Sequence, residues 1–376
     1  MARTKKKGKA KAKTQNQQIF PQTLSPLLQL PGELRNQIYN CLFASTRLTF
    51  GERNTGPITR KIMRPAINSL AILRVCRQIN QEARSLWLGE ILFSFEVVKN
   101  LLDKFSTLPS STLSQIRNVR TGGHPLMLQP IGGDDDVFYK LAWALKLLPG
   151  MNLDNLTVLG SSGGAIAYDT LGGLIKHGNG WRELHFITAN SEMLGFAKVR
   201  TFMAGPCWRK PQPSTWNDIL LRRDGANSGA SVTIYRSTQS HSPGTVIDPR
   251  TRQIFEQKVP SPKDLETFGV AEDKQLLAED EIGKELLVVV KRGHGANIRE
   301  QDTPPYKSID DIRQWSHGMT WAEIKRQCID FSIPMDDDDD YDDDFFAEGY
   351  ETDEVDDYTR VDDYVWEPFN WMAGAS

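Results

Sequence analysis

Residues 30–39 read LPGELRNQIY, and this stretch decides how the amino-terminal part of the chain folds. Leu34, Ile38 and Leu42 recur at intervals of four, the spacing that places side chains on one face of a helix. A proline is tolerated in the first turn of such a helix, and a glutamate suits its positive end. The sequence therefore predicts a helix over residues 31–43.

A second amphipathic pattern covers residues 67–87. Its polar residues fall on the face opposite to its apolar ones, which predicts a second helix. A strand over residues 93–98 and a helix over residues 97–108 are predicted to follow. The apolar face of the second helix is expected to consist of Ile72, Val75, Cys76, Ile79, Ala83 and Leu86.

After about residue 110, short apolar runs alternate with helical patterns. Such alternation favours parallel strands with helices on one side, similar in kind to an irregular leucine-rich array. We therefore predict a mixed α/β fold, with a helical region over residues 24–110 and an α/β region over residues 111–335. The predicted strands cover residues 116–120, 156–159, 184–188, 230–236 and 285–291. The predicted helices cover residues 137–148, 168–177 and 213–223, a last helix starts at the capping-box pair Thr320 and Glu323, and residues 237–280 are predicted to be a loop.

The net charge of −3 conceals two blocks of opposite sign at the ends of the chain. Residues 1–13 contain seven Lys or Arg and no acidic residue, whereas residues 336–363 contain sixteen Asp or Glu and one Arg. Blocks of like charge are typical of disordered interaction segments. We therefore predict a disordered basic arm over residues 1–20 and a disordered acidic and aromatic tail over residues 336–376.

The basic arm has no apolar stretch after its charges, so it does not resemble a secretory signal, and we expect a nuclear or cytoplasmic protein. Its lysines suit nuclear import or weak, sequence-independent contact with nucleic-acid phosphates. A purely solubilising arm is an alternative. No apolar run approaches the roughly 18 residues that a spanning helix needs, so no membrane association is expected. The lysines concerned are Lys5, Lys6, Lys7, Lys9, Lys11 and Lys13.

The acidic tail ends in aromatic residues. Trp366, Phe369 and Trp371 could form a short anchor that docks on the body of the protein or on a partner, because aromatic side chains supply most of the energy in such segments. The alternative is a tail that only solvates the protein. The sequence leaves both open.

Two motifs together carry a family resemblance. LPGELRNQIY at residues 30–39 and VCRQINQEA at residues 75–83, followed by Trp87, resemble the F-box, and more closely a group of fungal F-box-like proteins of unknown function. The resemblance covers about residues 26–105 and implies a substrate receptor of a Skp-cullin ubiquitin ligase, with a target protein held by the region downstream. It also implies that four motif residues contact the Skp adaptor: Leu30, Pro31, Leu34 and Ile38.

The sequence departs from the F-box pattern by an insertion at residues 44–63, where a short turn is expected. A further alternative concerns the motif residues themselves. The same apolar positions could simply attach the first helix to the second, because apolar helix faces more often lie in a core than in an interface.

A hydrolase is a remote alternative, because Gly160 to Gly164 fits the G-x-S-x-G pattern after a predicted strand. Ser162 would be the nucleophile, with His241 or His294 as the base. A simple strand-to-helix turn is the interpretation we favour. The histidines and the four cysteines lack metal-site spacing, so no catalytic site, metal or cofactor is expected, and Cys41 and Cys76 are expected in helix cores.

Overall fold

The computed structural model describes the greater part of the chain between residues 25 and 366. The described residues are 25–54, 60–131, 137–161, 163–195, 199–201, 205–207, 209–257, 276, 278–300, 306, 308, 310–316, 318–329, 351–355, 362, 364 and 366.

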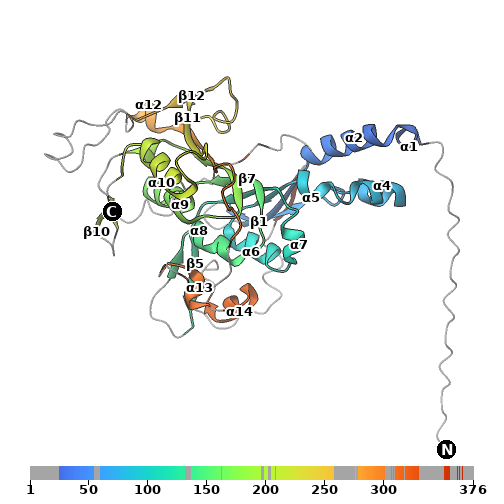
Figure 1. Ribbon diagram of the computed structural model, residues 1–376, viewed down its shortest axis with the longest axis horizontal. Helices are drawn as coiled ribbons and strands as arrows, with labels where there is room; N and C mark the ends of the chain where they lie inside the picture. Colours follow the sequence, from blue (N-terminus) through green and yellow to red (C-terminus); the bar gives the residue numbers. More distant parts are fainter. Residues whose placement is uncertain are drawn as a thin grey trace, which may run out of the picture.

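A large mixed sheet organises these residues (Figure 1). Within the described ranges it has ten strands, which confirms the predicted mixed α/β class. From one edge to the other the strands are β12 (Arg252–Phe255), β11 (Ser231–Ser240), β13 (Lys284–Lys291), β8 (Trp181–Thr188), β7 (Leu153–Leu159), β4 (Asn118–Gly122), β3 (Leu92–Phe95), β1 (Arg47–Asn54), β2 (Arg60–Pro65) and β15 (Glu351–Val355).

The centre of the sheet is a parallel array. β1, β3, β4, β7 and β8 are neighbours in chain order, and each pairs in parallel with the next. The strands predicted at residues 116–120, 156–159 and 184–188 are confirmed as β4, β7 and β8. The chain moves across the sheet in one direction, from each parallel strand to the next. Right-handed connections between such strands all lie on the same face of the sheet. The connections contain α6 (Val98–Phe105), α7 (Ser110–Leu113), α8 (Leu141–Ala144), the 3₁₀ turn η1 (Leu145–Leu147) and α9 (Gly164–His177).

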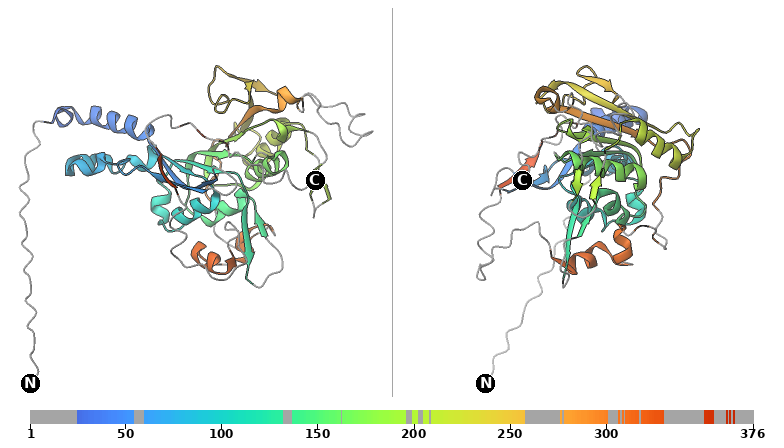
Figure 2. Two further views of the ribbon diagram at one scale, coloured as in Figure 1. Left: turned by 180° about the vertical axis from the view of Figure 1, so that it is seen from behind. Right: turned by 90° about the vertical axis from the view of Figure 1, so that its left-hand side faces the viewer.

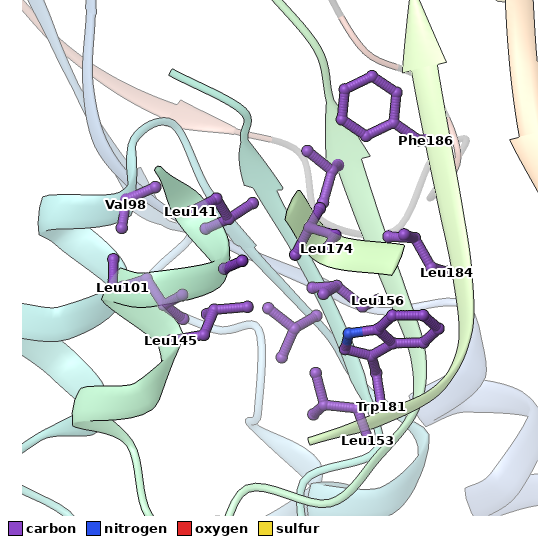
Figure 3. Packing of buried hydrophobic residues seen from close by; sticks show 14 of the residues in the cluster. Val98, Leu101, Leu141, Leu145, Leu153, Leu156, Leu174, Trp181, Leu184 and Phe186 are labelled. Atoms are coloured by element: carbon purple, nitrogen blue, oxygen red, sulfur yellow. The ribbon is translucent and has the colours of Figure 1, made fainter. Parts of the chain in front are cut away.

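The main core lies between this helical layer and the sheet (Figure 3). Leu141 of α8 and Leu174 of α9 point toward Leu156, Leu184 and Phe186 on the strands, and all five are fully buried. Because side chains alternate along a strand, every second residue of β8 faces the other way. The sheet therefore has a second face, and a smaller apolar cluster lies there: Ile187, Val246, Leu287, Val289 and Tyr364.

Three antiparallel strands extend the array beyond β8. β13 pairs with β8, β11 pairs with β13, and β12 forms the edge. The strands predicted at residues 230–236 and 285–291 are thus confirmed. The helix predicted at residues 213–223 is confirmed as α10 (Ser214–Asp224), which buries Trp216 and Leu220 in the main core.

The remaining described elements are short. α14 (Trp321–Arg326) begins at the predicted capping box, in which Thr320 and Glu323 exchange hydrogen bonds. The others are β5 (Leu126–Pro130), β6 (Val137–Tyr139), β14 (Cys328–Ile329), β9 (Val199–Thr201), β10 (Gly205–Cys207), η2 (Glu192–Leu194), α12 (Glu279–Ile282) and α13 (Ile312–Trp315). Of the helices in the described ranges, none is long and apolar enough to span a bilayer.

The amino-terminal helices form an arm that projects from the sheet (Figures 1 and 2). The helix predicted at residues 31–43 is confirmed as α2, and α4 lies beside it, with both helices running toward the sheet. The arm consists of α1 (Pro26–Gln29), α2 (Gly32–Ala44), α3 (Ile72–Val75), α4 (Arg77–Ala83) and α5 (Trp87–Glu90).

The prediction of one continuous helix over residues 67–87 is wrong. Cys76 has an extended backbone, with φ −157° and ψ 166°, and separates α3 from α4. Its sulfur accepts a hydrogen bond from the backbone N–H of Ile79, so it caps α4. The expected buried face is also interrupted: Val75 is exposed, and Cys41 of α2 is exposed rather than in a core.

The other corrections concern short strands. Residues 137–139 form β6, paired with β5, so the helix predicted over residues 137–148 starts only at Leu141. Residues 252–255 form β12 within the region predicted as a loop. The predicted boundary near residue 110 falls between β3 and β4, which are hydrogen-bonded neighbours, so the sheet is continuous across it.

The insertion and the acidic tail both contribute to the sheet. The insertion at residues 44–63 supplies β1 and most of β2, which pair with each other, while β1 also pairs with β3. From the tail, β15 pairs in parallel with β2, beside which it lies in Figure 2. The prediction of disorder throughout residues 336–376 therefore fails at residues 351–355. The basic arm, residues 1–20, lies outside the described residues.

Candidate functional site

The inner face of α2 is formed by large polar-tipped and aromatic side chains. Tyr39 and Phe43 are buried at 0% and 1% exposure, and Arg35 lies on the same side of the helix. These residues face α4 and the start of the sheet. The apolar positions of the motif are thereby turned outward, and Leu34 and Ile38 are 45% and 42% exposed.

Glu82 of α4 holds the two helices together. Its carboxylate accepts hydrogen bonds from Arg35 Nε at 2.8 Å and Arg35 Nη2 at 2.5 Å, and from Tyr39 Oη at 3.1 Å. Arg35 Nη1 also donates to the carbonyl of Leu30 at 2.5 Å, which fixes the entry into α2. The hydrogen bonds from Arg35, aided by Gln78 and Tyr39, outweigh partial burial and lower the pKa of Glu82 to about 2.

This clamp predicts a pH dependence. Because the pKa of Glu82 is lowered from 4.5 to about 2, the clamp stabilises the fold above about pH 4.5, and this stabilisation is lost as the pH falls toward 2. At pH 7 we expect Glu82→Gln to lower the melting temperature by a few degrees, since a pair near the surface contributes about 1 kcal/mol or less. The difference from wild type should shrink between pH 5 and pH 2.5.

Thermal melts of both proteins followed by circular dichroism at several pH values measure this difference. Glu90→Gln is the matched control, because Glu90 is an exposed residue of the nearby α5. A gap between wild type and Glu82→Gln that is the same at pH 7 and pH 2.5 contradicts the clamp.

The outward side of α2 presents a continuous apolar strip, which we call the α2 stripe: Pro31, Leu34 and Ile38. These three residues are spaced by three and four positions, so they lie along one side of the helix. Leu30, the fourth residue implied by the resemblance, is only partly exposed. The alternative in which Leu34 and Ile38 attach α2 to the second helix does not fit this orientation, since Tyr39 and Phe43 take that place.

A second polar centre lies on the face of the sheet opposite to the main core. Glu285 of β13 is 2% exposed, and its Oε1 accepts hydrogen bonds from Tyr364 Oη at 3.0 Å and Trp366 Nε1 at 2.8 Å. The structure therefore places Trp366 of the tail against the body, whereas Phe369 and Trp371 lie outside the described residues. Neither Glu285 nor Tyr364 was among the sites proposed from the sequence.

Of the three residues of the remote hydrolase alternative, the structure describes the two histidines and not the serine. Ser162 lies outside the described residues, after β7. His241 donates its backbone N–H to the carbonyl of Gly283, and His294 donates its own to Ser228. These contacts put the two histidines at opposite ends of β11. Among the described residues no group of three or more metal-ligating side chains occurs.

The lysines of the basic arm, Lys5 to Lys13, also lie outside the described residues, so nuclear import and phosphate binding stay predictions. Comparison of the chain with protein-family models, with curated proteins and with solved structures finds no match.

Proposed function

We propose that the chain is a non-enzymatic interaction module in which α2 and α4 form an F-box-like unit that binds a Skp-type adaptor of a cullin ubiquitin ligase. The observation that supports this proposal best is the exposure of Leu34 and Ile38 on the α2 stripe. An amphipathic helix that presents such a stripe can lay it in the apolar groove of a partner. The rest of the chain then serves to hold a target protein.

The surroundings of α2 are compatible with this contact. The clamp at Glu82 keeps α2 and α4 in a fixed relation, so little conformational entropy is lost when a partner binds. The described residues of the insertion form strands at the base of the arm (Figure 1), where they pair with the sheet and not with α2. The insertion, the main departure from the F-box pattern, is thus accommodated by the sheet.

The test is adaptor binding by a variant that changes only the stripe. Leu34→Asp is expected to weaken binding at least 100-fold, because a carboxylate in an apolar groove costs several kcal/mol and each 1.4 kcal/mol is a factor of ten. Because Leu34 is 45% exposed, the variant should fold normally. Recovery of purified Skp adaptor on the immobilised full chain, followed by a titration, gives the measurement.

Asn36→Asp is the matched control. It introduces the same charge on the same helix, but Asn36 is exposed and lies about 200° around the helix from Leu34. Arg35→Ala is unsuitable as a control, because it breaks the clamp with Glu82. Equal adaptor binding by Leu34→Asp and wild type, with equal melting temperatures, removes the adaptor proposal.

A further inference from the structure

The face of the sheet opposite to the main core is partly covered by Tyr364 and Trp366 of the carboxy-terminal tail. The helices of the main core pack on the opposite face, and Tyr364 and Trp366 lie over this one. Tyr364 and Trp366 both donate hydrogen bonds to Glu285 of this face, whereas Asp362 is exposed. The tail thus meets the sheet with a phenol and an indole that share one acceptor.

The floor beneath the two aromatic residues is apolar. Tyr364 belongs to one cluster with Ile187 of β8 and Leu287 of β13, and Trp366 packs against this cluster. The two rings contact each other edge to face, with centroids 5.1 Å apart. Ile187 and Leu287 are separated from the main core by the sheet itself, and Val246 of the loop packs with them beside Tyr364 and Trp366.

The floor contains one buried acceptor, Glu285. Its two oxygens receive five hydrogen bonds, of which Tyr364 and Trp366 supply two and the loop residues Gly244, Thr245 and Val246 supply three. All five donors are uncharged. A buried carboxylate of this kind selects ligand groups that donate hydrogen bonds, such as a phenol or an indole N–H.

The other end of the covered face is cationic. Arg120 of β4 is 6% exposed and donates to Ser94 at 3.1 Å. Burial, and then the nearby charge of Arg47, lower its pKa to about 10, while Glu96 and Asp362 of the tail act in the opposite direction. The negative charges of Glu96 and Asp362 therefore favour the cationic form of Arg120.

We propose that this face of the sheet around Glu285 is a binding site for a peptide with the pattern Tyr-x-Trp, and that the tail is its internal occupant. A target peptide of this chemistry has to displace the tail of the same chain. The tail is tethered, so it competes at an effective concentration of order mM. The site lies on β8 and β13, far along the chain from α2, and its existence does not depend on adaptor binding.

The experiment uses a fluorescent synthetic peptide with the sequence of residues 360–368 and the full-length chain. Binding is measured by anisotropy to wild type and to the double variant Tyr364→Ala and Trp366→Ala, which weakens the internal occupant. We expect the peptide to bind the double variant at least tenfold more tightly than wild type. A peptide with alanine at both aromatic positions should bind at least tenfold more weakly, and addition of Glu285→Gln to the double variant should have a similar effect.

Tyr364→Phe provides a second variant that keeps the ring and removes only the hydroxyl donor. It should also raise the affinity for the peptide, since loss of one hydrogen bond to a charged group corresponds to about a factor of ten or more. Equal affinity of the peptide for wild type and for cooperatively melting variants overturns the proposal. A wild-type dimer that disappears in the double variant also overturns it, because the tail would then occupy a second copy.

Discussion

Asp224→Ala is expected to lower the free energy of unfolding by about 3–5 kcal/mol, which is the typical cost of removing one partner of a buried ion pair. Asp224 accepts hydrogen bonds from Arg292 Nε at 2.7 Å and Nη2 at 2.8 Å, and from the backbone N–H of Gly293 at 2.9 Å. The side chains of Asp224 and Arg292 are 1% and 3% exposed. The pair therefore joins the end of α10 to the end of β13.

A second cation makes the loss more severe. Arg223 is adjacent, and burial together with the charge of Arg292 lowers its pKa to about 10. Without Asp224 the two guanidinium groups would be left beside each other with little access to water. Because a domain is stable by only about 5–15 kcal/mol, the variant should unfold at much lower temperature or denaturant concentration.

Urea unfolding of wild type and variant measures this effect. Asp218→Ala is the matched control, because Asp218 lies in the same helix but is exposed, and its loss should change the free energy by no more than about 0.5 kcal/mol. If Asp224→Ala unfolds at the same urea concentration as Asp218→Ala, the pair does not stabilise the junction.

The parallel array could be anticipated from the sequence because its strands carry a strong local signal. Leu184, Phe186 and their neighbours form short apolar runs, and helical patterns separate the runs. The antiparallel strands at the edges are harder to detect. Residues 137–139 and 252–255 owe their strand conformation to pairing with β5 and β11, which depends on the tertiary structure.

No pattern in the sequence predicts the break between α3 and α4. No glycine or proline interrupts residues 72–83, and cysteine is not among the preferred capping residues. Cys76 takes this role because its sulfur reaches the N–H of Ile79, while Asn80 Nδ2 bonds the carbonyl of Leu73 at 2.7 Å. Such contacts follow from three-dimensional geometry and not from periodicity.

The apolar residues of the α2 stripe could be identified from the sequence, but whether they face solvent or the core could not. α2 carries two candidate apolar sides, one with Leu34 and Ile38 and one with Tyr39 and Phe43. The aromatic side is buried because its rings cover more apolar area and because Tyr39 and Arg35 both find a partner in Glu82. Glu82 is 43 positions from Tyr39 in the chain. Which side of α2 is buried therefore depends on a contact between distant segments.

The site around Glu285 escaped detection for a related reason. A single glutamate at the start of the apolar run Leu286 to Val290 looks like a strand end in contact with water. In the structure the loop over residues 244–246 and the tail enclose it instead. The aromatic pattern of the tail did suggest an anchor, but its receptor is formed by residues roughly 80 positions earlier.

Glu285→Ala is expected to lower the free energy of unfolding by about 3 kcal/mol or more and to release the tail. Five donors share this carboxylate, and a buried donor without an acceptor costs about 1–3 kcal/mol. The donors of the tail can reach water by leaving the sheet, whereas the N–H groups of Gly244 and Val246 are held by the loop. The stability loss therefore comes mainly from the loop, and the release of the tail is a separate effect.

Two measurements separate these effects. Urea unfolding reports the stability, and limited trypsin digestion with mass analysis reports the tail, because Arg360 is the single Lys or Arg in residues 331–376. We expect faster cleavage after Arg360 in Glu285→Ala under conditions where the sheet stays folded.

Glu183→Ala is the matched control. Glu183 lies on the same face of the sheet, on β8, but is partly exposed beside Lys291, so its loss should cost about 1 kcal/mol or less. Equal cleavage rates after Arg360 in the two variants and in wild type would show that Glu285 does not hold the tail.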